Sequence, residues 1–380
     1  MSGEADPLLA VRVVSVGNRP RASWAGGLRV RLPASLLERN GWSRALAANG
    51  ALEIPSEPSS ITADDVARLR ERRAFTDVPP ASARLPVNYR IVPGWMRAVV
   101  ASAIGRRNRR HADRWAAFPQ WPIDLSADLL EDLSDAPRQT TSASRTPVVV
   151  THDVDSPEGL TNLVTSFLPL EESIGARSTS YIVPCAWRLD DALVAEIVAR
   201  GHDVGVHGYD HSHTTPFAAP AERRRRLDAA GEFAARYSAT GYRAPSLLRT
   251  RPLLRDLGAR FRYDSSIPTS GGLFPTPNNG CATARPFRLE DIAELPISLP
   301  RDGALRFLGH SPDEIVRIWI DCAELIARSR GVVVLLTHCE RRFSGQPRMF
   351  DAYRRFLEYV RDRPDCFAFC SPAAALNGGS

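Results

Sequence analysis

The sequence predicts an α/β fold in which parallel strands and helices alternate and curl into a deformed (β/α) barrel of seven or eight units. Short apolar runs recur after residue 145, and helical patterns such as 189–200 and 312–329 separate most of them. This alternation is typical of βαβ units, and an open doubly wound sheet fits it equally well. Polar side chains follow several of the runs, however, and a barrel collects its site from many strand ends, whereas an open sheet gathers it at one switch point. The barrel is therefore favoured. The apolar runs are 147–151, 179–183, 203–206, 241–242, 261–263, 293–299, 332–337 and 366–369.

The barrel is predicted to occupy residues 145–376, and residues 1–140 are predicted to form an extension of mixed α/β character. Alternating apolar and polar residues at 11–16 and 28–32 predict short strands in this extension. The segment 63–70 predicts a helix, because acidic residues occupy its first turn. These patterns assign no chemistry to the extension.

Two segments are strongly basic, and one is small and polar. The pattern from 93 to 115 is helical and gathers arginines at 106–110, and a second basic run is Arg223–Arg226. Such runs are usually a solvated helix face, and the alternative is a surface that docks on anionic lipid or grips a diphosphate. Residues 135–146 lack periodicity and are predicted to form the linker before the barrel.

The composition excludes several classes of protein. The formal charge of +6 comes entirely from arginine, since the chain contains no lysine, and no nucleic-acid-binding motif accompanies it. We therefore expect no nucleic-acid partner. The six cysteines have no paired spacing, and neither a secretory leader nor an 18-residue apolar span is visible. These features predict a cytoplasmic protein with reduced thiols.

The run Val148–Val150 leads into two carboxylates that suggest a hydrolytic site. Asp153 and Asp155 are two residues apart, so they share one face of an extended segment. One of them can bind a metal ion while the other takes a proton from the activated water. The alternative is that both carboxylates cap the turn before Ser156.

Two histidines complete the predicted metal set. His207 and His211 are four residues apart, so a helical turn would place both on one face. With Asp155 they form a two-histidine, one-carboxylate set that leaves positions for water and substrate. Asp203 or Asp210 is the expected acceptor that orients the imidazoles. The alternative is a pair of loop histidines without a ligand.

These residues lie in five short motifs, which are Thr151-His152-Asp153-Val154-Asp155, His207-Gly208-Tyr209-Asp210-His211, Arg243-Ala244-Pro245-Ser246, Tyr263-Asp264-Ser265-Ser266 and Leu336-Thr337-His338. Through these motifs the chain resembles the polysaccharide deacetylases, the NodB-homology carbohydrate esterases. The order of the motifs over residues 145–375 makes the match specific, and residues 93–122 and 281–300 look similar to a bacterial subgroup of unknown substrate. The resemblance implies a metal-dependent amide hydrolase on a deformed barrel.

The resemblance also implies roles for the motif residues. Asp153 is the expected general base and His338 the general acid. Arg243 is expected to hold Asp153 by a bidentate contact. Asp264 is expected either to orient His338 or Arg243 or to cap a turn. The residues expected at the metal are Asp155, His207 and His211. The residues expected to meet the substrate or its oxyanion are Tyr209, Pro245 and Ser246, the last through a backbone N–H.

The expected cofactor is a divalent metal, with Zn²⁺ favoured over Co²⁺, Ni²⁺, Mn²⁺ and Fe²⁺. His152 stands where relatives frequently carry Phe, and in an extended strand it points to the face opposite Asp153. Ser246 stands in place of a common aromatic residue, and residues 265–272 lack a tryptophan common in the family. Both differences count against a long acetylated polysaccharide as substrate.

The expected reaction is removal of an N-acetyl group from an amino sugar or glycan precursor, which includes lipid-linked and nucleotide-linked sugars. A deformylase or another C–N amide hydrolase is the alternative within the same chemistry. A mononuclear iron oxygenase can use the same triad, although a base at Asp153 favours hydrolysis. A silent glycan-binding domain is disfavoured, because base, ligands and acid are all present.

Overall fold

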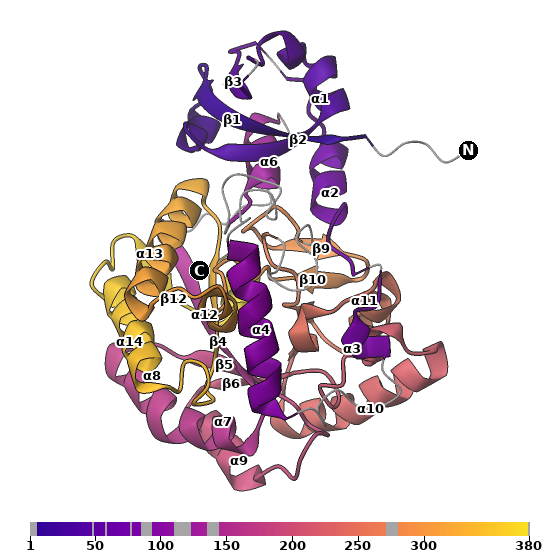
Figure 1. Ribbon diagram of the computed structural model, residues 1–380, viewed down its shortest axis with the longest axis vertical. Coiled ribbons are helices and arrows are strands. Elements are labelled where there is room, and N and C mark those ends of the chain that lie inside the picture. Colours follow the sequence, from indigo (N-terminus) through magenta and orange to yellow (C-terminus); the bar gives the residue numbers. More distant parts are fainter. Residues whose placement is uncertain are drawn as a thin grey trace.

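The computed structural model describes residues 6–47, 49–57, 59–76, 78–84, 93–109, 123–134, 144–270 and 280–378. Two sheets organise these residues (Figure 1). A small sheet has the strand order β2-β1-β3, and a nine-stranded sheet has the order β11-β4-β5-β6-β7-β8-β10-β9, with β12 also paired to β4. The small sheet lies at one end of the molecule, and the large sheet curls among helices in the remainder.

The large sheet is the deformed barrel that the sequence predicts. Each of the eight predicted runs overlaps one of its strands, and only β9 was not expected. Neighbouring strands are parallel except for β9, which runs antiparallel to β10. Its strands are β4 (Thr146–Val154), β5 (Ser178–Ile182), β6 (Asp203–Val206), β7 (Gly241–Tyr242), β8 (Tyr263–Asp264), β9 (Phe287–Leu289), β10 (Ile292–Glu294), β11 (Val333–His338) and β12 (Phe367–Phe369).

Strand β4 is an interior strand of the sheet, and its residues from Pro147 to Val154, most of them β-branched, are buried on both faces. It pairs with β5, β11 and β12. The register places His338 opposite Asp153, at the carboxyl ends of their strands. Polar side chains after these strands therefore converge at one mouth of the barrel.

Helices cover the outside of the barrel. Helix α13 has the bounds that the sequence predicts, and it begins with a capping box in which Ser311 and Glu314 bond each other's backbone N–H groups. These helices are α7 (Pro157–Asn162), α8 (Leu168–Ile174), α9 (Asp191–Ala199), α10 (Pro220–Tyr237), α11 (Arg251–Gly258), α12 (Asp302–Phe307), α13 (Pro312–Ser329), α14 (Pro347–Arg361) and α15 (Pro372–Leu376). A π-helical segment, η4 (Leu163–Phe167), joins α7 to α8, and 3₁₀ turns are η5 (Thr215–Phe217) and η6 (Pro245–Leu247).

The extension contains the two predicted strands and the predicted helix near residue 63. Its strands are β1 (Leu8–Val16), β2 (Arg29–Pro33) and β3 (Ala51–Ile54), and its helices are α1 (Ala34–Arg39), α2 (Ala63–Glu71), α3 (Ala81–Arg84), α4 (Gly94–Arg109) and α6 (Ser126–Leu133), with 3₁₀ turns η1 (Pro20–Ala25) and η2 (Trp42–Arg44). Most of the predicted linker lies outside the described residues, and the boundary at 140–145 stays a prediction. Within the described ranges, no helix has the length and apolarity that crossing a bilayer requires.

Helix α4 joins the extension to the barrel. It lies across the front of the barrel beside α12 (Figure 1). Gly105 permits this contact, because a Cβ there would lie 2.0 Å from the carbonyl oxygen of Phe307. Arg109 adds a hydrogen bond from Nη1 to the carbonyl oxygen of Gly309, at 2.8 Å.

Candidate metal centre and active site

The three predicted metal ligands converge at the carboxyl ends of β4 and β6. Asp155 Oδ1 lies 3.5 Å from His207 Nε2 and 3.3 Å from His211 Nε2. One ligand atom from each of the three residues lies within 4.8 Å of the others. Asp155 Oδ1 is buried and has no hydrogen-bond partner among the described residues. An unsatisfied oxygen beside two imidazole nitrogens fits a divalent cation, and this donor set suits Zn²⁺.

The histidines meet through a loop with left-handed residues, so the helical turn expected from their spacing is wrong. His211 has φ +59°, and Gly208 has φ +69°. Glycine is also required at position 208 by space, since a Cβ would lie 2.5 Å from the Pro245 ring. Pro245 therefore fixes the path of the histidine loop and does not line the cavity, and its expected contact with substrate stays a prediction.

His207 is oriented by a backbone carbonyl, which corrects the expectation of an Asp203 or Asp210 acceptor. Its Nδ1 lies 3.0 Å from the carbonyl oxygen of Arg243, which can only accept, so Nδ1 carries the proton and Nε2 keeps its lone pair for a metal. Asp203 begins β6 at the opposite end from the site, and Asp210 accepts from the Ser212 backbone N–H.

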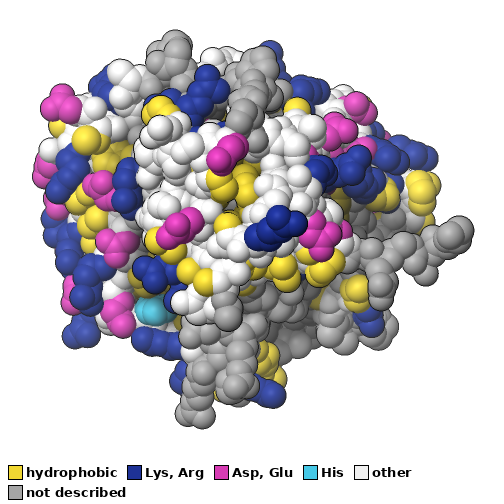
Figure 2. All heavy atoms as spheres, turned by 90° about the horizontal axis from the view of Figure 1, so that it is seen from above, with side chains coloured by type: hydrophobic (Ala, Val, Ile, Leu, Met, Phe, Trp, Pro, Cys, Tyr) yellow, Lys and Arg dark blue, Asp and Glu magenta, His cyan; other side chains and the backbone are white. Residues whose placement is uncertain are grey.

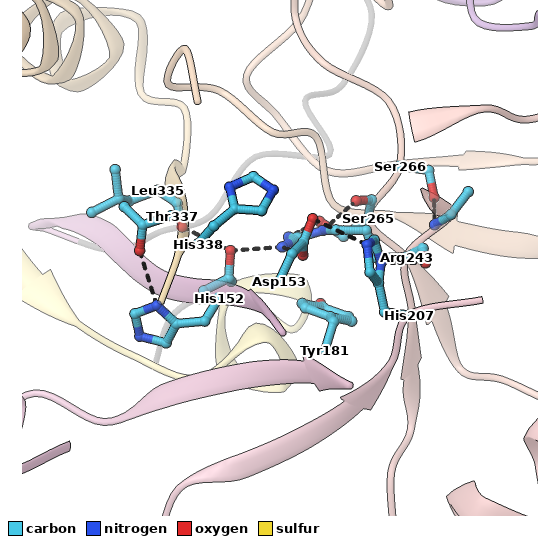
Figure 3. A network of polar contacts seen from close by, with 12 residues as sticks. His152, Asp153, Tyr181, His207, Arg243, Ser265, Ser266, Leu335, Thr337 and His338 are labelled. Carbon is cyan, nitrogen blue, oxygen red and sulfur yellow. Dashed lines mark hydrogen bonds and ion pairs between the residues drawn. The ribbon is translucent and has the colours of Figure 1, made fainter. Parts of the chain in front are cut away.

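Asp153 is buried beside the triad, and Arg243 holds it (Figure 3). The contact is a single hydrogen bond from Nη1 to Asp153 Oδ1, at 3.0 Å, so the bidentate expectation is wrong. The rest of the guanidinium bonds Thr151 and Ser265 and stacks on the Tyr181 ring, 4.0 Å from its centroid. Burial opposes ionisation of Asp153, but His207, Arg243 and His338 outweigh it and lower its pKa. Asp153 is therefore ionised at neutral pH.

His338 ends β11 on the other side of Asp153, and Asp302 orients it. His338 Nδ1 lies 2.8 Å from Asp302 Oδ1, and the other carboxylate oxygen accepts from the His338 backbone N–H and the Ser344 hydroxyl. Burial lowers the pKa of His338, but Asp302, Asp155 and Asp153 outweigh it and raise the pKa to about 9. An imidazolium at neutral pH is the form that a general acid needs.

Asp264 does not play the role expected for it at His338 or Arg243. Among the described residues, its hydrogen bonds go to Ser266, at 2.6 Å, and to Glu294. Ser266 Oγ in turn accepts from the Ala244 backbone N–H at 2.8 Å. Asp264 thus supports the loop after Arg243 through Ser266, and the Arg243 charge also acts on its carboxyl.

Two predicted substrate contacts have different outcomes. Tyr209 does not line the cavity, because its ring lies under the Arg225 and Arg226 guanidiniums, with centroid distances of 5.7 and 5.3 Å. Ser246 does line the cavity; it has φ +52°, and its Oγ lies 2.7 Å from His213 Nε2. Its proposed backbone role at an oxyanion stays a prediction.

His152 points away from the site, as its position in an extended strand predicts (Figure 3). Its Nε2 lies 2.8 Å from Glu171 Oε1, and its Nδ1 lies 2.9 Å from Thr337 Oγ1. The ring packs edge-on against Phe167 and Tyr353. His152 is a buried structural residue and is not a metal ligand in this arrangement.

The sequence reasoning missed Asp302 and Glu340. Glu340 Oε1 accepts from the Asp155 backbone N–H and the Ser156 hydroxyl, both at 2.9 Å, so it supports the ligand loop. Burial and the Asp155 charge raise the pKa of Glu340 to about 7. Its place two residues after His338 was a usable signal, whereas Asp302 begins a helix and gave none.

A cavity of about 260 Å³ opens over the three candidate metal ligands, Asp153 and His338. This volume is slightly below the ~300–1,000 Å³ that is typical of ligand pockets. Helix α4 of the extension supplies part of one wall through Ala98 and Ala101. The remaining lining residues are Asp153, Asp155, His207, His211, His213, Ser246, Arg301, Gly303, Ala304, Phe307, His338, Arg342 and Phe343.

No protein-family model and no curated protein matches the chain. Among solved structures, a candidate polysaccharide deacetylase from Mycobacterium smegmatis covers 64% of this chain and 93% of its own, at 20% identity and a TM-score of 0.50. The chain has the polysaccharide deacetylase fold. A family 4 carbohydrate esterase from Streptomyces lividans in complex with acetate covers 62% of the chain and 97% of its own, at 16% identity and a TM-score of 0.41. The PuuE allantoinase covers 68% and 97%, at 17% identity and a TM-score of 0.49. At these identities the likeness concerns the deacetylase fold alone.

Proposed function

We propose that this protein is a metal-dependent hydrolase that removes an N-acetyl group from an amino sugar or glycan precursor. The observation that carries the proposal is one arrangement of three groups. A two-histidine, one-carboxylate set lies beside an ionised aspartate on one side and an imidazolium on the other. These three functions together suit metal-dependent amide hydrolysis.

The residues divide the reaction between them. A divalent metal held by Asp155, His207 and His211 would activate water and polarise the acyl carbonyl. Asp153 takes the proton of the attacking water, and Arg243 holds its carboxylate toward the cavity. His338 donates a proton to the leaving nitrogen, which otherwise departs poorly as an anion.

The cavity supports a small substrate end rather than a long chain that passes through the site. Its volume is about 260 Å³, and Ala98 and Ala101 of α4 close part of one wall. A lipid-linked or nucleotide-linked sugar that enters with a single residue fits this space. A cytoplasmic location, proposed from the sequence, agrees with such precursors.

Three alternatives use the same residues or the same fold. A deformylase differs only in the acyl group, and formate release identifies it. An iron oxygenase would use the triad without a base and an acid, so the Asp153–Arg243 and His338–Asp302 pairs favour hydrolysis. A silent glycan-binding domain would not need these pairs.

Metal analysis and acyl release from the same protein preparation test the proposal. The purified protein is expected to hold close to one divalent ion per chain and to release acetate from some N-acetylated amino sugars. Asp153→Asn should keep the metal and lose about 10²- to 10⁴-fold in kcat, because only the base is removed. Asp155→Asn is the matched variant and should lose the metal. The outcome against the proposal is metal-loaded protein that releases neither acetate nor formate but consumes O₂ with a 2-oxo acid.

Peripheral membrane contact is also proposed, and α4 is the helix that supports it. Its outer face exposes Met96, Val99, Val100 and Ile104 beside Arg106 and Arg107. The second basic run is engaged, because Arg223 pairs with Asp256 at 2.7 Å and Arg226 with Glu222 at 2.6 Å. On the face in Figure 2, arginines are intermixed with acidic side chains. Sedimentation with anionic vesicles tests the contact.

A further inference from the structure

Two arginines in the catalytic cavity have no task in the mechanism. Arg301 precedes α12, and Arg342 lies in the loop after β11, so the two come from different elements. Both line the cavity that holds the metal triad, the base and the acid. Neither forms a hydrogen bond or an ion pair with the residues that the structure describes. Arg342 stacks on the Phe343 ring, with 4.9 Å between its guanidinium carbon and the ring centroid.

Arg243 provides a comparison, because its guanidinium is fully hydrogen-bonded within the protein. It is fully buried, and every nitrogen of its guanidinium bonds a named partner. Arg301 is half-buried and Arg342 is exposed, which places the first inside the cavity and the second at its mouth. Each guanidinium therefore offers N–H donors to a molecule that enters.

The charges of the cavity favour an anion. Burial lowers the pKa of Arg301, and the nearby carboxylates of Asp153, Asp302 and Asp155 oppose this shift. A divalent cation with Arg243, Arg301 and Arg342 carries more charge than these carboxylates. A neutral acetamido sugar would leave this excess uncompensated in a partly buried site, whereas a phosphate or a carboxylate would be drawn to it.

We infer that Arg301 and Arg342 form an anion subsite, and that the substrate is an N-acylated sugar that carries a phosphate ester or a carboxylate. This inference rests on the proposed function and narrows it to a substrate class. Arginine suits the task because its planar donors bind phosphate and carboxylate oxygens in pairs. Phe343 contributes to this subsite, since its ring positions the Arg342 side chain at the mouth of the cavity.

Kinetics on matched substrates test the inference. The panel is N-acetylglucosamine, its 1-phosphate, its uridine diphosphate derivative and N-acetylmuramic acid, so the phosphate and carboxylate sources are separated. We expect kcat/KM to be at least ~10-fold higher for one charged class than for the neutral sugar. Arg301→Gln and Arg342→Gln should each lower the charged-to-neutral ratio of kcat/KM by about 10- to 100-fold, mainly through KM.

Arg341→Gln is the control, because this exposed neighbour lies 3.5 Å from Glu158 and does not line the cavity. It should keep both the activity and the ratio. Equal kcat/KM for charged and neutral sugars in the unchanged protein overturns the inference and leaves the hydrolase proposal standing. The inference is also overturned if Arg301→Gln and Arg342→Gln leave the charged-to-neutral ratio of kcat/KM unchanged while they slow both substrates equally or lose the metal. That result would show that the two arginines only screen the carboxylates.

Binding of inorganic phosphate separates the two proposals if no N-acylated sugar is hydrolysed. Calorimetry on the metal-loaded protein should then show weaker phosphate binding in Arg301→Gln and Arg342→Gln than in Arg341→Gln. Equal binding in all three variants rejects the anion subsite independently of the reaction. Thermal unfolding of each variant confirms that the compared proteins are folded.

Discussion

At the scale of single residues, the site sets two titratable groups in opposite protonation states. Positive neighbours lower the pKa of Asp153, and the Asp302 carboxylate raises the pKa of His338 to about 9. The proposed base, Asp153, is therefore ionised and the proposed acid, His338, is protonated over the same range around neutrality. Asp302 is the proposed positioning residue for this acid, since its carboxylate both orients the His338 ring and balances the imidazolium charge.

Asp302→Asn should move the alkaline limb of the pH profile to lower pH. Burial lowers the pKa of His338, and without the Asp302 charge less opposes it, so the acid loses its proton earlier as pH rises. At pH 8 we expect kcat to fall by about 10²-fold. The measurement is kcat from pH 5 to 10. A bound cation moves the alkaline limb to lower pH in both proteins. The result is therefore the difference in pH between the two alkaline limbs.

Ser344→Ala is the matched control for this prediction. It removes a neutral hydrogen bond of 2.7 Å to the same carboxylate and keeps the charge. Its alkaline limb should stay close to that of the unchanged protein. Alkaline limbs at the same pH in all three proteins would contradict the role given to Asp302.

The residue scale also shows what the sequence could predict about the site. Asp153, Asp155 and His338 were found because they follow apolar strands, and parallel strands deliver such residues to one mouth. Asp302 was not predicted because it begins a helix 36 residues before its partner His338, and only folding brings the two residues together. Tyr209 was misplaced because the left-handed Gly208 turns the loop, and periodicity does not report a positive φ.

At the scale of elements, the strands were predictable and the placement of α4 was not. Apolar runs identified eight strands, whereas β9 gave no apolar run because the exposed Arg288 separates its two apolar residues. The helical pattern after residue 93 was visible as well. Its position over the cavity depends on Gly105 and Phe307, which are distant in sequence and meet only in the fold.

Gly105→Ala should destabilise the protein although alanine is the better helix former. The gain in helix propensity is ~1 kcal/mol. However, the new Cβ would lie 2.0 Å from the backbone oxygen of Phe307, and a backbone atom cannot shift without displacing α12. Overpacking of this kind costs ~1–3 kcal/mol, so we expect a lower Tm. KM should also rise, because Ala98 and Ala101 move with α4.

Gly231→Ala in α10 is the matched control, since nothing lies within 4 Å of its added Cβ. It should raise the free energy of unfolding by about 0.5–1 kcal/mol and leave KM unchanged. Thermal unfolding and steady-state kinetics of both variants make the comparison. If Gly105→Ala stabilises as Gly231→Ala does, α4 is not seated on α12.

At the scale of the whole molecule, one buried ionic cluster ties the small sheet to the barrel. Helix α6 of the extension is buried along its length and places Asp128, Glu131 and Asp132 around Arg285 of the barrel. Arg285 lies 2.5 Å from Glu131 and 3.0 Å from Asp132. Arg70 of α2 completes the cluster, at 3.0 Å from Glu131.

Arg285→Met should therefore destabilise the protein in a pH-dependent way. It leaves buried carboxylates without their main counter-ion, which costs ~3–5 kcal/mol at neutral pH. Burial already raises the pKa of Asp128 to about 6, with Arg285 opposing it, so the variant should raise that pKa further. A carboxyl with a raised folded-state pKa destabilises the fold in full above that pKa, and this cost declines as pH falls from the folded-state pKa toward the unfolded-state pKa. The loss of Tm should be large at pH 8 and small at pH 5.

The exposed Arg288, which bonds the carbonyl oxygen of Asp291 at 3.1 Å, supplies the control variant Arg288→Met. Its effect on Tm should be small and equal at both pH values, because surface cations contribute little. Equal losses for Arg285→Met at pH 8 and pH 5 would mean that lost packing, rather than uncompensated charge, weakens the variant. The apolar residues of α6 would then provide most of the attachment of the extension to the barrel. The position of α4 at the cavity wall would not depend on pH.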